Sequence, residues 1–394
     1  MIIEPKIVRN VCLTAHPAGC VQGVKEQIQW VSRQPAGERT PQRVLVIGGS
    51  TGYGLAARIT AAFWGKADTV SISFEREPSG RKTGTPGWYN NRAFDREARK
   101  VGLKAITIEG DAFSHKIKAR TIETIQRELG QVDLVIYSLA SPMRVDPDTG
   151  ETYMSVLKPL GTPYTGQTVD MMTDRVSSVT VEPAEEGQTE ATVKVMGGED
   201  WKLWIEKLME ADVLDEGAAT VAFSYIGPEM TFPLYREGTI GRAKEHLETT
   251  ASELNKELGP LKGHAYVSVN KALVTRASAV IPVVPLYISI LYRVMKDRGM
   301  HEGCIEQAYR LFHDRLYAGG AVPVDRQGRI RIDDYEMLPD IQEEVHRRWE
   351  RVTSESLPEI ADMGGFRKEY LQLHGFEYAG IAYHKDVDPE IIPE

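Results

Sequence analysis

The chain has 394 residues, with 47 lysines and arginines against 56 aspartates and glutamates, so its formal net charge is −9. Because no basic excess is present to neutralise phosphates, a nucleic-acid partner is not expected. The hydrophobic content of 42% and the charged content of 26% are those of an ordinary globular protein with a large core.

The cysteines and the apolar runs bear on location. Cys12, Cys20 and Cys304 form neither a disulfide framework nor a CxxC pair, which favours a reducing compartment. The chain start has no basic region followed by an apolar stretch, so no signal peptide is expected. The longest nearly apolar run, Ala279 to Tyr292, is shorter than the roughly 20 residues that a membrane span needs. We therefore expect a cytoplasmic protein without membrane insertion, in which this run is buried or forms a pocket wall.

From residue 43 onward the sequence predicts strands that alternate with helices. Strands are expected at 43–48, 69–74, 105–109, 133–138, 219–224 and 265–269. Helices are expected around 55–64, 116–129, 201–210 and 243–258. Alternation of this length indicates βαβ units. The predicted class is α/β, a Rossmann-type doubly wound parallel sheet with helices on both faces.

Two segments depart from this alternation. Strands at 176–182 and 189–195 predict a β-hairpin around the turn-rich residues 183–187. A short hairpin centred on Gln327-Gly328 is expected among the C-terminal helices. We interpret 1–394 as a single large catalytic domain. Its expected parts are an N-terminal extension (1–42), a nucleotide-binding half (43–140), an insertion with the hairpin (141–199), a catalytic and substrate half (200–300) and a C-terminal helical extension (301–394).

A glycine-rich loop lies between the first strand and the first helix. Its sequence is Gly48-Gly49-Ser50-Thr51-Gly52-Tyr53-Gly54, with the spacing G-x-x-x-G-x-G. Glycines permit a tight turn and close backbone approach, while the helix N-terminus offers free N–H groups to a pyrophosphate. The alternative is a glycine-rich turn without a ligand, but the strand–loop–helix context favours nucleotide binding.

The second strand ends at Phe74 and Glu75, where such folds place the residue that faces the adenosine ribose. A carboxylate there accepts hydrogen bonds from the ribose hydroxyls and repels a 2′-phosphate, which favours NAD over NADP. Arg76, Arg81 and Lys82 argue against this preference, and a solvated strand-end charge is the other interpretation of Glu75. The next two strand ends supply further candidate cofactor contacts at Asp111, Ala112, Leu139 and Ala140.

The same loop spacing is used by short-chain dehydrogenase/reductases, whose chemistry needs a tyrosine proton donor and a lysine. Tyr225, Tyr235 and Lys244 follow the fifth predicted strand. Nine positions along one continuous helix would separate Tyr235 from Lys244 by about 13 Å. We therefore expect Gly238 and Gly241 to let the chain bend, with Tyr235 on a loop and Lys244 in the first helical turns. The residues alone favour the other interpretation, in which these are two of 16 tyrosines and one of many lysines without a catalytic role.

Seven motifs stand in order along the chain: His16-Pro-Ala-Gly-Cys20, Gly48-Gly-Ser-Thr-Gly52, Thr85-Pro-Gly-Trp-Tyr-Asn-Asn91, Lys194-Val-Met-Gly-Gly-Glu-Asp-Trp201, Tyr235-Arg-Glu-Gly-Thr-Ile-Gly241, Ser268-Val-Asn-Lys-Ala-Leu-Val-Thr275 and Gly375-Phe376. Together they resemble the FabV-type enoyl-acyl-carrier-protein reductases and the closely similar trans-2-enoyl-CoA reductases. These are enlarged relatives of the short-chain dehydrogenase/reductases that carry the spacing Y-x8-K. The resemblance extends from Ile2 to the C-terminal region.

This resemblance implies roles for the matching residues. Tyr235 corresponds to the catalytic proton donor, Lys244 to its catalytic and cofactor-binding lysine, Tyr225 to a substrate-contacting tyrosine, and Glu75 to the position that discriminates NADH from NADPH. The implied NAD contacts are Gly48, Gly49, Ser50, Thr51, Gly52, Tyr53, Phe74, Glu75, Asp111, Ala112, Leu139, Ala140, Lys244, Leu273, Val274 and Thr275.

The implied activity is NADH-dependent reduction of the trans-2 double bond of an enoyl thioester on acyl carrier protein or coenzyme A, the final reductive step of fatty acid elongation. Hydride reaches the β-carbon, and Tyr235, with Tyr225, stabilises the enolate. No metal is expected, and the chain is expected to be a monomer. The alternatives are an NAD-dependent alcohol or sugar dehydrogenase that acts on a carbonyl and a nucleotide-sensing protein without catalysis. His16 and Cys20 are interpreted as structural, and the 88–91 cluster either lines the site or packs a helix.

Overall fold

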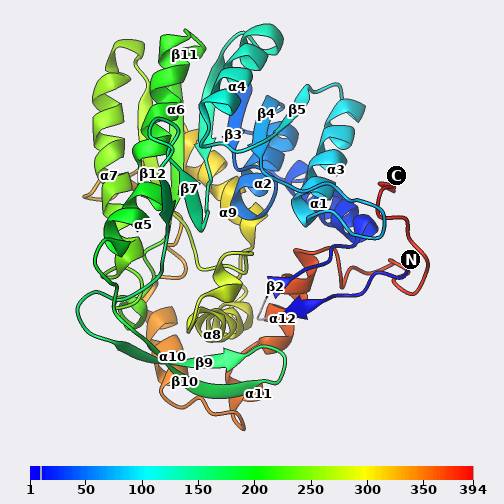
Figure 1. The fold of residues 1–394 in the computed structure, drawn as a ribbon, viewed down its shortest axis with the longest axis vertical. Helices are drawn as coiled ribbons and strands as arrows, with labels where there is room; N and C mark the ends of the chain where they lie inside the picture. Colours follow the sequence, from blue (N-terminus) through cyan, green and yellow to red (C-terminus); the bar gives the residue numbers. More distant parts are fainter. Residues whose placement is uncertain (9–10, 394) are drawn as a thin grey trace.

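A seven-stranded parallel sheet runs through the computed structural model, which describes residues 1–8 and 11–393 (Figure 1). Its strands are β3 (Arg43–Ile47), β4 (Asp68–Ser73), β5 (Ala105–Glu109), β6 (Val132–Tyr137), β11 (Leu214–Ser224), β12 (His264–Val269) and β13 (Arg329–Arg331). Their order in space is β13-β12-β11-β6-β3-β4-β5, and every neighbouring pair is parallel. The predicted α/β class and the six predicted strands are confirmed.

Helices cover both faces because successive side chains of a buried strand point to opposite sides. In β3, Val44 and Val46 join one apolar cluster, whereas Leu45 and Ile47 join another. The first cluster packs against α1 (Pro17–Ser32), α2 (Gly52–Ile59), the π-helical turn η1 (Thr60–Trp64), α3 (Pro86–Lys100), α9 (Cys304–Arg310) and η5 (Leu311–Leu316). The second packs against α4 (His115–Glu128), α6 (Glu199–Glu210) and α7 (Thr239–Glu257).

A third apolar cluster lies outside the sheet, in the lower part of Figure 1. It is built on α8 (Val284–Asp297), with α10 (Pro339–Trp349), α11 (Leu357–Ile360), α12 (Met363–Gln372) and the small N-terminal strands β1 (Ile7–Val8) and β2 (Val11–Cys12) around it. In α8, residues 286–292 are all 1% exposed or less. The predicted burial of the apolar run is therefore confirmed for residues 286–292. Among the described residues, no helix combines the length and the hydropathy that a bilayer span requires.

The hairpin predicted at 176–182 and 189–195 is wrong. The observed hairpin joins β9 (Tyr164–Asp170) to β10 (Arg175–Val181), and residues 189–195 lie within α5 (Gln188–Met196). A carboxylate oxygen of Asp170 accepts the backbone N–H groups of Met172 and Thr173 and so forms the turn between the strands. Segment 188–196 buries Thr192 and Val195, three positions apart, which is a helical pattern rather than an alternating one. A second small hairpin pairs β7 (Met143–Val145) with β8 (Thr152–Met154).

The hairpin predicted at Gln327-Gly328 is also wrong. Asp325 accepts the backbone N–H groups of Gln327 and Arg329, so a tight turn is present. The strand after this turn, β13, pairs in parallel with β12 and not with the segment that precedes the turn. The turn therefore starts the seventh strand of the central sheet.

Candidate active site

The glycine loop fills the narrow space between the ends of three strands. Gly48 donates its backbone N–H to the carbonyl oxygen of Ile72 at 2.9 Å and has a φ of +90°. A Cβ at Gly48 would lie 2.4 Å from the carbonyl oxygen of Ser138, and one at Gly54 would lie 2.0 Å from that of Gly48. Thr51 precedes α2 and makes no side-chain capping bond. The first N–H groups of α2 are thus available to a ligand.

Glu75 follows β4 and turns back toward this loop. The Ser50 hydroxyl donates to Glu75 Oε1 at 2.7 Å, and Arg276 Nη1 lies 3.8 Å from the same oxygen. The Glu75 side chain is only 7% exposed, so it is not a solvated strand-end charge. Within the described residues, Arg276 is the cation paired with Glu75, whereas Arg81 lies beside residues 386–389.

The other predicted cofactor contacts also follow parallel strands and therefore meet at one edge of the sheet. Phe74 is 82% exposed, and Asp111 is half-buried with its carboxylate accepting the backbone N–H of Phe113. Ala112 is buried, Leu139 is half-buried and Ala140 is exposed. The reversal of strand order between β3 and β6, where such folds bind nucleotides, lies at the same edge.

The segment after β12 lies against the glycine loop. Tyr53 donates its hydroxyl to the carbonyl oxygen of Lys271 at 2.6 Å, and Thr275 Cγ2 would lie 3.7 Å from a Cβ at Gly52. Leu273 and Val274 are buried, and the backbone N–H of Val274 donates to the Tyr292 hydroxyl of α8. The structure thus brings predicted residues 48–53 and 273–275 together.

Tyr225 and Tyr235 face each other beyond the end of β11. Their ring centroids lie 5.0 Å apart and the rings are nearly perpendicular. Burial raises the pKa of Tyr235 to about 12, so its phenol is protonated at neutral pH. Tyr235 lies on a turn between η2 (Glu229–Thr231) and α7, as predicted. A Cβ at Gly241 would lie 1.8 Å from the carbonyl oxygen of Arg236, which explains the glycine in this bend.

Lys244 occupies the second turn of α7 and reaches the same strand end. Its Nζ donates to the carbonyl oxygen of Phe223 at 3.2 Å, two residues before Tyr225. Burial lowers the pKa of Lys244 to about 8, and the Glu248 carboxylate opposes that shift. The predicted geometry, a loop tyrosine followed by a lysine near the start of the helix, is therefore confirmed.

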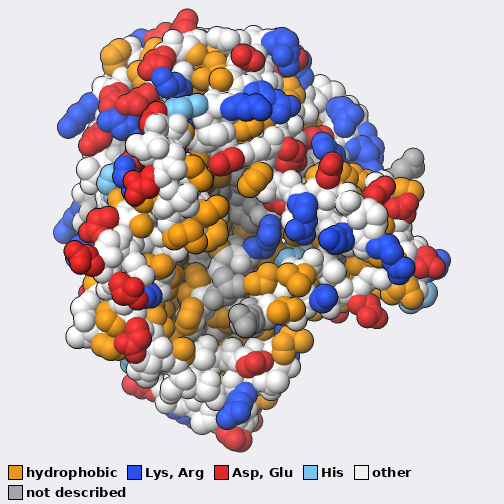
Figure 2. Space-filling model, in the orientation of Figure 1, with side chains coloured by type: hydrophobic (Ala, Val, Ile, Leu, Met, Phe, Trp, Pro, Cys, Tyr) orange, Lys and Arg blue, Asp and Glu red, His pale blue; other side chains and the backbone are white. Residues whose placement is uncertain are grey.

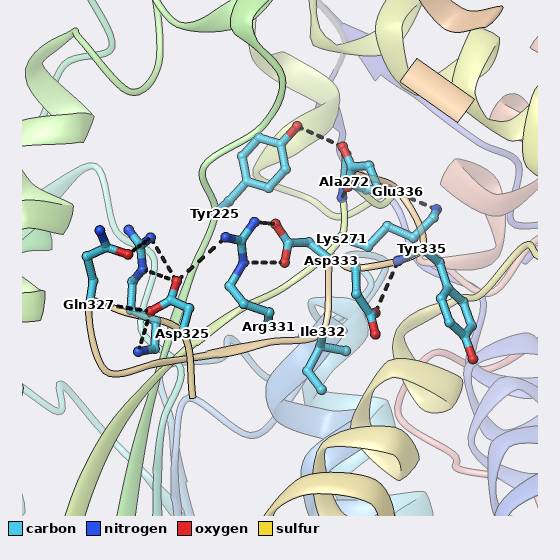
Figure 3. Close-up of polar contacts among 12 residues, drawn as sticks. Tyr225, Lys271, Ala272, Asp325, Gln327, Arg331, Ile332, Asp333, Tyr335 and Glu336 are labelled. Atoms are coloured by element: carbon cyan, nitrogen blue, oxygen red, sulfur yellow. Dashed lines mark hydrogen bonds and ion pairs between the residues drawn. The ribbon is translucent and has the colours of Figure 1, made fainter. Parts of the chain in front are cut away.

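Sequence reasoning missed a buried carboxylate behind Tyr225. Glu336 is fully buried. Its Oε1 accepts from the Tyr225 hydroxyl at 3.3 Å, and its Oε2 accepts the backbone N–H of Ala272 at 2.7 Å (Figure 3). The Tyr287 hydroxyl also donates to Oε1, at 2.7 Å. Burial raises the pKa of Glu336, and the Lys271 ammonium opposes this shift. No motif marks Glu336 in the sequence, because its partners are 49 to 111 positions away.

Lys271 lies within the motif 268–275, from which no role for it is predicted. Its side chain is 2% exposed; Nζ donates to the carbonyl oxygen of Ala272 at 3.2 Å and lies 4.9 Å from the centroid of the Tyr292 ring. Burial lowers the pKa of Lys271 to about 8, and the Glu336 carboxylate is the first of the charges that oppose this. A lysine two positions after a largely apolar strand is the signal that marks it.

The remaining candidates support the site from outside. His16 is buried at the N-terminus of α1, where its Nδ1 accepts the backbone N–H of Gly19, and Cys20 is buried in α1. Asn90 donates to the carbonyl oxygen of Ser50, and Asn91 donates to the Ser73 hydroxyl. The 88–91 cluster therefore packs α3 and also holds the glycine loop.

Figure 2 shows that this face of the molecule is hollowed between the part that holds the sheet and the part that holds α8. Hydrophobic side chains gather around the hollow, and lysines or arginines stand on one side of it. The close-packed glycine loop, the uncapped start of α2 and the carboxylate of Glu75 are the features that a dinucleotide of the NAD type requires. These residues fit NADH.

Three family descriptions match this chain. Residues 2–80 match the NAD(P)H binding domain of trans-2-enoyl-CoA reductase, and residues 82–317 match the trans-2-enoyl-CoA reductase catalytic region. Residues 324–387 match a description named enoyl reductase FAD binding domain. The three matches together cover most of the chain.

Individual relatives agree with these matches. An enoyl-acyl-carrier-protein reductase (NADH) of Flavobacterium johnsoniae is 57% identical over 388 residues, which cover 98% of each chain. A trans-2-enoyl-CoA reductase (NADH) of Brachyspira hyodysenteriae is 53% identical and covers 98% of this chain and all of its own. The crystal structure of Treponema denticola trans-2-enoyl-CoA reductase in complex with NAD superimposes with a TM-score of 0.95 at 52% identity, over 98% of each chain.

The residues of 324–387 do not fit a flavin. This region contains β13, α10, α11 and α12, and buried Ile341, Val345 and Phe366 pack on α8. Its Gly364-Gly365 pair begins α12, but the Asp362 carboxylate caps that helix by accepting the Gly365 N–H at 2.8 Å and would repel a phosphate. From this region, the Glu336 side chain contacts the site residues Tyr225 and Ala272.

Proposed function

The chain belongs to the trans-2-enoyl-CoA reductase family, and we propose that it uses Tyr235 and Lys244 to reduce the trans-2 double bond of an enoyl thioester. It is an NADH-dependent oxidoreductase of fatty acid metabolism. NADH, when bound, supplies the hydride that reaches the β-carbon. The observation that carries the assignment of roles is the facing pair Tyr225 and Tyr235 at the strand edge that also holds the glycine loop.

Tyr235 is the proton donor to the thioester oxygen in this proposal. Negative charge develops on that oxygen as the β-carbon is reduced, and a positioned hydroxyl stabilises it most where water is excluded. The raised pKa of Tyr235 keeps the proton on the phenol until that charge develops. The α-carbon is then protonated, which gives the saturated acyl thioester.

Lys244 and Glu75 bind the cofactor in this proposal. The Lys244 ammonium is held at the end of β11 by the Phe223 carbonyl, from where it contacts the nicotinamide ribose. Glu75 accepts hydrogen bonds from the adenosine ribose and disfavours a 2′-phosphate. Residues 48–53, 74, 111–112, 139–140 and 273–275 complete the cofactor site.

The acyl chain is assigned to a wall formed by the segment 279–292. Its side chains on α8 are buried and apolar, and acyl ligands bind in concave, mostly apolar pockets. Both acyl carrier protein and coenzyme A are proposed as carriers. The three cysteines are unpaired and support a reducing, cytoplasmic location. The monomeric state stays a prediction that light scattering tests.

The test is stopped-flow loss of NADH absorbance with crotonyl-CoA, with acetoacetyl-CoA, and without an acceptor. Oxidation of NADH with crotonyl-CoA but not with acetoacetyl-CoA is the expected result. Oxidation only with acetoacetyl-CoA would assign a carbonyl dehydrogenase, and NADH binding without oxidation would assign a sensor.

A further inference from the structure

Glu336 is a buried charge that the proposed reaction does not use. Its backbone is placed beside the site because β13 pairs in parallel with β12, and the chain after β13 remains hydrogen-bonded to the end of β12. The backbone N–H of Ile332 donates to the carbonyl oxygen of Val269 at 2.9 Å, and the N–H of Met337 donates to that of Asp333. The Arg331 guanidinium binds both carboxylate oxygens of Asp333, at 2.7 and 2.5 Å (Figure 3). These hydrogen bonds and the Arg331–Asp333 ion pair fix the turn that carries Glu336.

This carboxylate connects three segments that build the site. Ala272 belongs to the segment after β12, Tyr225 to the segment after β11 and Tyr287 to α8. The three donors share two oxygens on one fully buried side chain. Gln342 on α10 donates to the Glu336 carbonyl oxygen at 2.7 Å and fixes the backbone as well. These hydrogen bonds fix the three segments relative to one another, because each buried donor would lose its acceptor if its segment moved.

The direction of these hydrogen bonds determines what Tyr225 offers to a substrate. The Glu336 carboxylate accepts the Ala272 N–H and both hydroxyls, so the Tyr225 hydroxyl gives its single proton to Glu336. Tyr235 differs, since within the described chain its hydroxyl makes no hydrogen bond. One tyrosine of the facing pair has its proton committed, and the other has its proton free for a ligand. The nearby Lys271 ammonium favours the ionised form of Glu336.

We propose that Glu336 is a positioning residue, which orients Tyr225 by holding its hydroxyl proton and so leaves Tyr235 as the donor to the thioester oxygen. This inference rests on the proposed function. Tyr225 then contributes its ring, which packs against the Tyr235 ring, and its oxygen lone pairs. The C-terminal region thus takes part in catalysis through one side chain that never contacts the substrate.

Glu336→Gln tests this directly while keeping the shape of the side chain. The Ala272 N–H needs an acceptor, so the new carbonyl oxygen keeps that place and the new NH2 group faces Tyr225 and Tyr287. Both hydroxyls must then accept, and the Tyr225 proton turns away from residue 336. With crotonyl-CoA we expect kcat to fall about tenfold or more, with an unchanged dissociation constant for NADH. Glu344→Gln, an exchange on the outer part of α10, is the matched control and should leave both values unchanged.

A double-mutant cycle separates positioning from a general effect on the fold. In the Tyr225→Phe background, Glu336→Gln should change kcat by less than about twofold, because the bond through which Glu336 acts is already absent. In the Tyr287→Phe background it should keep its full effect. If the losses from Glu336→Gln and Tyr225→Phe multiply, or if Glu336→Gln keeps the wild-type kcat, the inference is wrong.

Glu336→Asp provides a second variant if Glu336→Gln does not fold. It keeps the charge but withdraws the carboxylate by one methylene, and the same loss of kcat is expected. Failure of the proposed function is distinguishable, because the wild-type protein would then not oxidise NADH with crotonyl-CoA. An active wild type with an unaffected Glu336 variant overturns the positioning role alone.

Discussion

The guanidinium of Arg276 lies 3.8 Å from the carboxylate of Glu75, although the two residues follow different strands of the sheet. Arg276 extends the segment 273–275 after β12, and Glu75 follows β4. The Arg276 side chain is 41% exposed and covers a carboxylate that is 7% exposed. The residue that we propose discriminates between NADH and NADPH therefore has a cation beside it.

Glu75→Ala should raise the use of NADPH relative to NADH. In the wild type, a 2′-phosphate placed a few ångströms from Glu75 meets a repulsion of about 1 to 4 kcal/mol, depending on the local dielectric. Without that carboxylate, Arg276 becomes free to pair with the phosphate. The ratio of kcat/KM values for the two cofactors measures the change.

The double variant Glu75→Ala/Arg276→Met is the matched control for this role of Arg276. It should lose most of the gain in NADPH use that the single variant shows. A wild type that already prefers NADPH, or a ratio that Glu75→Ala leaves unchanged, would place cofactor discrimination at another residue.

Tyr235→Phe should lower kcat by about a hundredfold or more. The substitution removes only the hydroxyl that we propose stabilises charge in the transition state, so NADH binding measured by fluorescence titration should be retained. Tyr309→Phe is the control, since that ring packs with Trp30 and Trp64 in the apolar cluster on the first face of the sheet. Near-wild-type turnover of Tyr235→Phe would move the donor role to Tyr225.

Lys244→Met should weaken NADH binding and also stabilise the fold at neutral pH. Below pH 8 the folded chain holds a buried ammonium, whose pKa is lowered from 10.5 to about 8. Burying the charged Lys244 side chain destabilises the folded chain. Between pH 8 and pH 10.5 the unfolded chain binds more protons than the folded chain, so stability rises with pH in this range. The destabilisation is therefore full below pH 8 and disappears as the pH rises toward 10.5. The gain is about 3 kcal/mol. Thermal denaturation at pH 7 and at pH 10 checks this.

The affinity for NADH should also fall as the pH rises through about 8, because the ammonium of Lys244 is lost. Lys271→Met is the comparison, since burial lowers the pKa of Lys271 to the same value. If the pH dependence disappears in Lys271→Met and persists in Lys244→Met, then Lys271 is the group that titrates.

Gly54→Ala should weaken NADH binding and destabilise the fold by about 1–3 kcal/mol, because the added Cβ would lie 2.0 Å from the carbonyl oxygen of Gly48. Gly259→Ala is the matched control, as no atom lies within 4 Å of its added Cβ. Melting temperature and NADH titration of both variants provide the comparison. Equal behaviour of the two would show that the loop tolerates a side chain.

The sequence predicts the fold well wherever a strand is buried on both faces. Residues 44–47 and 134–137 are uninterrupted apolar runs, and both lie in the sheet. β13 could not be found in this way, because it has three residues and arginine at both ends. Its conformation depends on pairing with β12, which is a tertiary contact. Residues 189–195 alternate in sequence, yet their packing against α7 makes them helical.

For the site, motifs predict the residues proposed to bind cofactor and substrate, but not the residues that position those side chains. The glycine spacing and Tyr235 lie in recognisable patterns that local geometry requires. Glu336 is one of 56 acidic residues and has no local signature. Arg276 follows directly after a predicted cofactor segment, but only the folded chain shows that it reaches Glu75.

The position of Glu336 in the chain has a consequence for biosynthesis. Its partners Tyr225 and Ala272 precede it by 111 and 64 residues. A nascent chain that has emerged only as far as α8 already exposes the glycine loop and both tyrosines, but Ala272 and Tyr225 lack their acceptor. The apolar side chains of α8 must also wait for α10 and α12 to cover them, and such exposed surface is prone to aggregation. The catalytic centre can therefore be completed only late in synthesis. A prematurely terminated chain would be prone to aggregate and would not be a smaller active enzyme.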